Sequence, residues 1–183
     1  ILDFFNSIIK EKDFEFIKPA PIQDHYPLSR GQNRLWILNE LGETKGLYNS
    51  PLILPVGDLN IDMLQETLNE LISRHEILRT IIKVVDGQPR QFVKEIDNFK
   101  LNIDHIEAIS ESDYITIIEK ELFYPFDLTE SAIKASLLKD HVGKVLLVLV
   151  FHHIIIDAWS LDVLRNEITE VYKSKSSGTS VSI

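Results

Sequence analysis

The chain has 183 residues, of which 44% are hydrophobic, and this is enough to bury the core of one domain. The formal net charge is -9 and the 19 lysine and arginine residues are scattered, which argues against nucleic-acid and membrane partners. Because cysteine is absent, the sequence excludes disulfides, a thiolate nucleophile and cysteine zinc sites, and it suits a reducing cytoplasm. The longest apolar run, residues 145–156, is too short to span a bilayer.

The amino-terminal residues 1–18 have an amphipathic helical pattern without a basic head or a cleavage site, so no signal peptide is expected. The chain begins without methionine, and we interpret it as a piece of a longer protein. The prolines of "KPAPIQDHYP" predict an extended connector, so the compact domain is expected to begin near Tyr26. In "PLSRGQNRLWILNEL", Ser29 and Gln32 form a capping-box pattern that predicts a helix with an apolar face.

The next elements are a strand, a helix and a hairpin. "NSPLILPV" predicts the strand, and Asn60 or Asp62 then caps a helix that is expected to carry "RHEILRT" at its end. The apolar face of this helix is expected at Leu64, Leu68, Leu71, Ile72 and Leu78. "TIIKVV" and "RQFVK" around "DG" predict a hairpin, whose loop Gln88 and Pro89 are expected to lengthen beyond two residues.

The second half of the chain also mixes strands with helices. "LNIDHI" predicts a strand, and Ser110 with Asp113 begins a helix that Pro125 closes. "AIKASLLK" and "KVLLVLVFHHIII" predict a second hairpin whose last strand is apolar on both faces and therefore central in a sheet. A helix is expected from Ser160 onward, followed by the polar end "KSKSSGTSVSI" as a mobile loop. The interleaved elements predict an α/β sandwich.

The run "VLLVLVFHHIIIDAWS" places two adjacent histidines at the end of this central strand. Side chains alternate along a strand, so His152 and His153 should face opposite sides, which argues against a metal ion held by both. One histidine is expected to face the packed layer and the other to reach a cleft at the strand's end. From the residues alone, a structural histidine there is more common than a catalytic one.

Two further polar residues follow the histidines. Ser160 lies in no "GxSxG" elbow, so it is expected to cap or stabilise the start of the next helix. Asp157 is either a cap or an ionic partner that fixes the turn and thereby orients His153. The sequence leaves both readings of Asp157 open.

Three ordered stretches point to a family. "HHIIIDAWS" resembles the "HHxxxDG" motif of the condensation domains of nonribosomal peptide synthetases, a superfamily shared with chloramphenicol acetyltransferase. "YPLSRGQNRLWILNEL" resembles the first motif of that family and "RHEILRT" resembles the second, while "GLYNSPLIL" and "FYPFDL" also fall where the family has them. The resemblance implies a chloramphenicol acetyltransferase-like lobe with a mixed sheet and packed helices, facing a second lobe across a tunnel.

The resemblance also implies a division of the chain. Residues 1–25 would be a linker from an upstream carrier domain, residues 26–173 the amino-terminal lobe, and residues 174–183 the start of the connection to the second lobe. The implied partners are donor and acceptor carrier domains, the carboxy-terminal lobe and an adjacent adenylation domain. The lobe itself would bind no metal and no organic cofactor, because the phosphopantetheine arms belong to the carriers.

The implied reaction is amide formation between two carrier-bound thioester substrates. By motif position His153 is the catalytic residue, acting as a base toward the attacking amine or positioning the amine and the tetrahedral intermediate. His152 is implied to be structural. Asp157 would form a structural salt bridge or fix the turn, with Arg74, Arg79 or an arginine of the second lobe as its cation.

The remaining motif residues are expected to support the site. Arg74 and His75 would brace the active-site strand, because long paired side chains at helix ends usually serve packing and capping. The same is expected of the residues of the first motif that would lie near the tunnel floor, which are Ser29, Gln32, Arg34 and Trp36. Ala158, Trp159 and Ser160 form the motif turn, where Ala158 replaces the glycine of the motif and its methyl group would narrow the path or restrict the backbone.

Several functional outcomes stay open at this stage. The motif pattern argues against heterocyclising and epimerisation domains. The isolated lobe is expected to fold without catalysing, because one wall of the tunnel is missing. The alternatives to peptide-bond formation are a non-catalytic docking or scaffold module, and an acyltransferase whose acceptor is a hydroxyl or a soluble amine.

Overall fold

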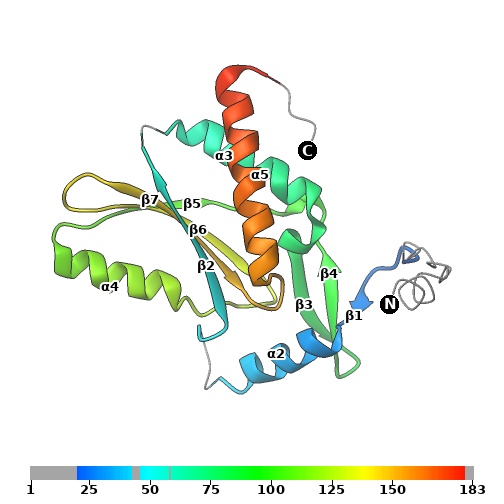
Figure 1. The fold of residues 1–183 in the computed structure, drawn as a ribbon. Coiled ribbons are helices and arrows are strands. Elements are labelled where there is room, and N and C mark those ends of the chain that lie inside the picture. The colour runs from blue at the N-terminus through cyan, green and yellow to red at the C-terminus, as the bar shows by residue number, and fades with distance from the viewer. Residues whose placement is uncertain (1–19, 43–45, 58, 180–183) are drawn as a thin grey trace, which may run out of the picture.

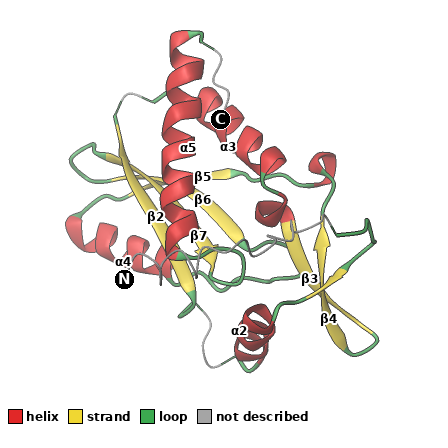
Figure 2. Cartoon of the chain, turned by 45° about the vertical axis from the view of Figure 1, so that its right-hand side comes forward, coloured by secondary structure: helices red, strands yellow, loops and turns green. Residues whose placement is uncertain are grey.

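The computed structural model describes residues 20–42, 46–57 and 59–179. The helix expected over residues 1–18 lies outside these ranges. The described strands form two sheets, one with the order β1-β4-β3 and one with the order β2-β7-β6-β5. The smaller sheet lies to one side of the larger one, with helix α2 (Arg30–Glu40) next to it (Figure 2). Of the helices in the described part, none is long and apolar enough to cross a membrane.

The smaller sheet joins β1 (Tyr26–Pro27), β4 (Gln88–Val93) and β3 (Thr80–Val85), all antiparallel. The β3–β4 loop has only two residues, because Asp86 and Gly87 both adopt positive φ, at 50° and 70°. Such a loop matches the twist of the two strands. The expectation that Gln88 and Pro89 lengthen the loop is therefore wrong, and both residues pair within the ladder. Pro89 is tolerated because alternate residues of an antiparallel pair point their amides away from the partner.

The larger sheet contains β2 (Asn49–Val56), β7 (Val145–His152), β6 (Ile133–Lys139) and β5 (Ile103–Glu107). Strand β7 pairs antiparallel with β2 on one side and β6 on the other, and β5 runs parallel to β6, so the sheet is mixed. Residues 147–151 are at most 1% exposed, which confirms the prediction of a central strand covered on both faces. The strand ends at His152 and turns, although the apolar run continues to Ile156.

The helices are α2 (Arg30–Glu40), α3 (Ile61–Arg74), α4 (Glu111–Leu122) and α5 (Ala158–Ser177), with short 3₁₀ turns η1 (Glu76–Arg79) and η2 (Ile96–Asn98). The predicted caps are confirmed, since Ser29, Asn60 and Ser110 each accept a hydrogen bond from the third residue of their helix. Ser29 and Gln32 form the full capping box. Helices α3 and α5 pack against each other (Figure 1).

Two helix boundaries differ from the prediction. Helix α3 ends at Arg74, because His75 has an extended backbone, and the buried Leu78 belongs to η1. Helix α5 begins at Ala158 and continues to Ser177, where Gly178 ends it with a φ of 67°. Residues 173–177, which were expected to belong to a mobile loop, therefore form the end of this helix.

The two faces of the larger sheet meet different helices. Lys134 and Ser136 of β6 contact Glu121 of α4 on one face, which we call the α4 face. The opposite face carries Leu52 and packs toward α3 and α5, as expected from the alternation of side chains along each strand. Helices thus cover both sides of a mixed sheet, which confirms the predicted α/β sandwich.

Candidate active site at the end of strand β7

The two adjacent histidines are held from opposite sides. The amide of His152 donates to the carbonyl of Ala132, at 2.8 Å, and the amide of His153 donates to the carbonyl of Tyr48, at 2.7 Å. One bond is made toward the β6 side and the other toward β2. His152 is 3% exposed, whereas His153 is exposed. The prediction that one histidine faces the packed layer is confirmed for His152, whereas the predicted cleft at His153 stays a prediction.

His152 belongs to the protein interior. Its Nδ1 accepts a hydrogen bond from the Ile154 amide, at 3.1 Å, and its ring meets the ring of Phe126 edge-on at 6.3 Å between centroids. Burial lowers the pKa of His152 to about 4, and the neighbouring His153 adds to the effect. The ring is therefore neutral at pH 7. With Nδ1 accepting, the proton is assigned to Nε2.

The ring of His153 has one hydrogen-bond partner in the described part of the chain. Its Nδ1 lies 3.2 Å from the hydroxyl oxygen of Ser50, the second residue of β2. Among the described residues, Nε2 makes no hydrogen bond or ion pair. A histidine held at one nitrogen and open at the other has the arrangement needed for acid–base or hydrogen-bonding chemistry.

Asp157 is the N-cap of α5. Its carboxylate accepts a hydrogen bond from the Ser160 amide, at 2.8 Å. This bond is the main reason why the pKa of the Asp157 carboxyl lies below its usual value, so the group is ionised at neutral pH. The structure confirms that Asp157 is a cap, with Ser160 as the donor of the capping hydrogen bond, and an ion pair with an arginine of the second lobe stays a prediction.

The two arginines considered as cations for Asp157 are engaged elsewhere. Arg74 pairs with Glu70, at 3.3 Å, within α3. Arg79 pairs with Glu76, at 3.6 Å, and donates to the carbonyl of Lys94. Neither of these predicted ion pairs with Asp157 is formed. Helix geometry explains this, because each arginine finds a carboxylate three or four residues away on its own helix.

His75 pairs with a residue of α5. Its Nε2 lies 2.5 Å from a carboxylate oxygen of Glu167, which joins the end of α3 to the helix that follows the motif turn. A cavity of about 180 Å³ adjoins this pair. Its wall includes both members of the pair, the motif residues Ile155, Ile156 and Ser160, and the apolar Ile77, Leu78, Val163 and Leu164.

The first motif touches the turn through Gln32. Its side-chain amide donates to the carbonyl of Ile154, at 3.3 Å, and to Gln91 of β4, at 3.4 Å. Its carbonyl oxygen accepts from the Ser29 amide, at 2.9 Å, within the capping box. Gln32 therefore links α2, the smaller sheet and the motif turn. Trp36 packs partly buried against the core, whereas Arg34 is exposed.

The motif turn itself has ordinary backbone geometry. Ala158 is the first residue of α5, and Asp86 is the residue other than glycine with positive φ in the described part of the chain. A helical φ suits alanine, so the backbone at this position does not require the glycine of the motif. Trp159 follows in the first turn of α5 and is 80% exposed.

The sequence did not identify two of the contacts that build this site. Ser50 and Glu167 lie 103 and 92 residues from the histidines that they contact. Strand register decides the first contact and helix packing decides the second. The only sequence signal for Ser50 is its place in "GLYNSPLIL", a stretch that carries no chemical signature of its own.

Comparisons with known proteins identify the family. The model of the condensation-domain family matches residues 22–183. The nonribosomal peptide synthetase kk1B of Curvularia clavata is 40% identical over 152 residues, which are 82% of this chain and 1% of that protein. Surfactin synthase subunit 2 of Bacillus subtilis (strain 168) is 36% identical over 172 residues, which are 92% of this chain and 5% of that protein. The chain belongs to the condensation-domain family, and it spans a small part of these relatives.

Solved structures agree on the fold. The starter condensation domain of the rhizomide synthetase RzmA aligns with a TM-score of 0.75 at 18% identity, over 88% of this chain and 40% of that one. The first condensation domain of the calcium-dependent antibiotic synthetase, in complex with a substrate analogue, aligns with a TM-score of 0.73 at 19% identity, over 87% and 41%. These likenesses establish the condensation-domain fold for this chain.

Proposed function

We propose that the chain is the amino-terminal half of a condensation domain that forms amide bonds between carrier-bound thioester substrates in nonribosomal peptide synthesis. The observation that carries this proposal is the state of His153, whose ring is exposed at the end of a buried strand with Nδ1 held and Nε2 open. The relatives named surfactin, gramicidin S and bacitracin synthases support the reaction class.

In the proposed reaction the acceptor's amine attacks the donor's thioester carbonyl. A C–N bond forms, the C–S bond breaks through a tetrahedral species, the amine loses a proton and the thiol leaves. Nε2 of His153 takes that proton or donates a hydrogen bond to the intermediate. Holding two tethered reactants together supplies much of the acceleration, which limits what the histidine must contribute.

The neighbouring residues have structural roles in this proposal. His152, buried and neutral, fixes the end of β7, and Asp157 fixes the start of α5. His75 with Glu167, and Gln32 with the Ile154 carbonyl, brace the turn between them. Among the contacts of the described residues, none of these five side chains hydrogen-bonds to Nε2 of His153.

The proposed partners are the donor and acceptor carrier domains, the carboxy-terminal lobe and an adenylation domain of the parent chain. The relatives are synthetases of which this chain spans 5% or less, so a parent of that kind has room for such domains. The substrates' phosphopantetheine arms would be brought by the carriers. A cytoplasmic location is proposed from the lack of cysteine.

The test uses the longer parent protein with loaded donor and acceptor carriers, and follows the mass of the acceptor carrier. We expect the wild type to gain the donor's mass and His153→Ala to slow this transfer by about 100-fold, a typical contribution of acid–base catalysis. His141→Ala is the matched control, because His141 is an exposed histidine in the β6–β7 turn.

Each outcome assigns the function. Wild-type rates in His153→Ala would remove the catalytic role of this residue. No transfer by a wild-type parent whose carriers work with another partner would favour a docking module, and transfer to a free amine or hydroxyl would favour the other acyltransferase class. The same assay is run with the 183-residue chain alone. We expect this chain to fold but not to transfer the donor group, because the open side of His153 is exposed to water.

A further inference from the structure

The turn that leads into β2, together with the start of that strand, holds both the backbone and the ring of His153. The carbonyl of Tyr48 accepts from the His153 amide, at 2.7 Å, and the hydroxyl of Ser50 lies 3.2 Å from Nδ1. Two contacts from one short segment fix a side chain better than either alone, because rotation of the ring about its own backbone would break the second. Figure 1 shows β2 running beside β7 where the latter ends.

The register of β2 against β7 puts Ser50 on the same face of the sheet as His153. Asn49 pairs with His152 and Ser50 pairs with Phe151. The Asn49 side chain donates to the carbonyls of Leu122 and Tyr124, at 2.9 Å each, next to α4. Ser50 therefore points to the other face, where His153 emerges, because neighbouring side chains on a strand alternate. A shift of one residue would exchange the two.

The partner of Nδ1 is a neutral hydroxyl although the motif contains a carboxylate. Within the described residues, Asp157 uses an oxygen to cap α5 and makes no hydrogen bond to His153, with which it interacts only through its charge. A carboxylate can only accept, so it would favour a protonated Nδ1 and a charged ring. A hydroxyl accepts from a protonated Nδ1 and donates to an unprotonated one. It can keep the ring in place whichever nitrogen carries the proton.

We propose that Ser50 is a positioning residue that orients the ring of His153 so that Nε2 points to the reacting groups through both protonation states. The proposal rests on the role proposed above for His153. It adds that a residue outside the histidine motif, on the neighbouring strand, determines how well that histidine works.

The experiment compares single-turnover condensation by the parent protein carrying Ser50→Ala or Ser50→Thr, with the loaded acceptor carrier varied. We expect Ser50→Ala to lower the maximal rate by about tenfold, as the loss of one orienting hydrogen bond would, without a change in the half-saturating acceptor concentration. Ser50→Thr keeps a hydroxyl and should stay within about threefold of the wild type. Ser73→Ala, at an exposed serine of α3, is the control for an unrelated hydroxyl.

The outcomes separate this proposal from the proposed function. If His153→Ala is inactive and Ser50→Ala is as fast as the wild type, the role of Ser50 is overturned and that of His153 stands. If His153→Ala is as fast as the wild type, both fall. Equal slowing by Ser50→Ala and Ser50→Thr, or a drop in melting temperature that accounts for the loss, would assign Ser50 to the fold and overturn the proposal.

Discussion

The α4 face of the larger sheet and the motif turn both carry polar side chains, but they hold them differently. On the α4 face the buried Glu121 carboxylate meets Lys134 and the Ser136 hydroxyl, the latter at 2.5 Å, and Lys134 also pairs with Asp104 at 3.1 Å. These charged groups are paired with one another. At the motif turn His153 and Asp157 are exposed, and each has one principal polar contact.

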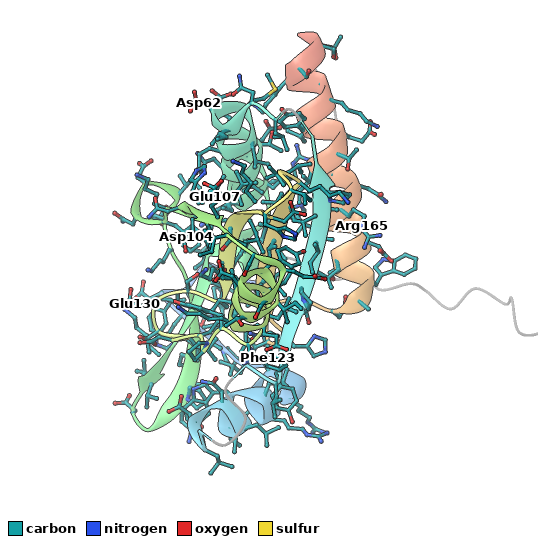
Figure 3. The ribbon with its side chains drawn as sticks, turned by 90° about the vertical axis from the view of Figure 1, so that its left-hand side faces the viewer. Asp62, Asp104, Glu107, Phe123, Glu130 and Arg165 are labelled. Carbon is teal, nitrogen blue, oxygen red and sulfur yellow. The ribbon has the colours of Figure 1, made fainter. Side chains whose placement is uncertain are left out.

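This difference in burial determines which side chains are available to react with a substrate. A buried charge is costly unless it is paired, so every partner on the α4 face is committed to the fold. Water satisfies an exposed group, so His153 keeps a nitrogen open without a penalty. Figure 3 labels Asp104 and Glu107 of β5, which pair with Lys134 and Lys139 of β6.

The largest expected effect concerns the buried carboxylate. We expect Lys134→Ala to lower the free energy of unfolding by about 4 kcal/mol, because it leaves Glu121 buried without its cation. Urea unfolding measures the change. The double variant Lys134→Met with Glu121→Leu should recover most of the loss.

The matched control is the exposed pair of Lys139 of β6 with Glu107 of β5, at 2.7 Å. Lys139→Ala should cost less than about 1 kcal/mol, as surface pairs do. Equal losses for Lys134→Ala and Lys139→Ala would show that burial does not distinguish the α4 face.

The second effect is a dependence of stability on pH that arises at His152. The pKa of His152 is lowered from 6.5 to about 4 in the folded chain, so between these values the unfolded state binds more protons. The contribution of the neutral His152 to the free energy of unfolding is therefore complete above pH 6.5. It decreases by about 3 kcal/mol as the pH drops to 4.

Unfolding curves at pH 7, 5.5 and 4 measure this slope in the wild type and in His152→Asn, which should lack this contribution. His141→Asn, at an exposed histidine, should keep the wild-type slope. If His152→Asn kept that slope too, the acid sensitivity would have to come from other groups.

The smallest effect is expected at Asp157. Asp157→Ala removes the cap of α5 and should lower the melting temperature, whereas Asp157→Asn retains a capping oxygen and should stay near the wild type. Because its pKa is lowered, the carboxylate contributes stability at neutral pH that is lost in acid. Asp162→Ala, in the same helix, serves as the comparison. A role as an ion-pair partner would instead make Asp157→Asn as damaging as Asp157→Ala.

Local patterns in the sequence determined much of the fold. Ser29, Asn60 and Ser110 cap the helices that they were predicted to cap, because capping depends on atoms three residues apart. The uniform apolar character of residues 145–151 placed β7 at the centre of its sheet. Alternation along that strand separated His152 from His153, and the ordered motifs identified the family.

Tertiary structure decided the partners of these residues. The contacts of His153 with Ser50 and of His75 with Glu167 depend on strand register and on the packing of α3 against α5, which no local pattern encodes. The finding that Asp157 caps α5 and pairs with neither Arg74 nor Arg79 also required the structure, because each of these arginines pairs with a carboxylate on its own helix. The sequence by itself determined the main helices and strands and placed the two histidines on opposite sides, since these follow from periodicity, and the family motif singled out His153. Only the folded chain decided what holds that histidine, since this depends on residues about a hundred positions away.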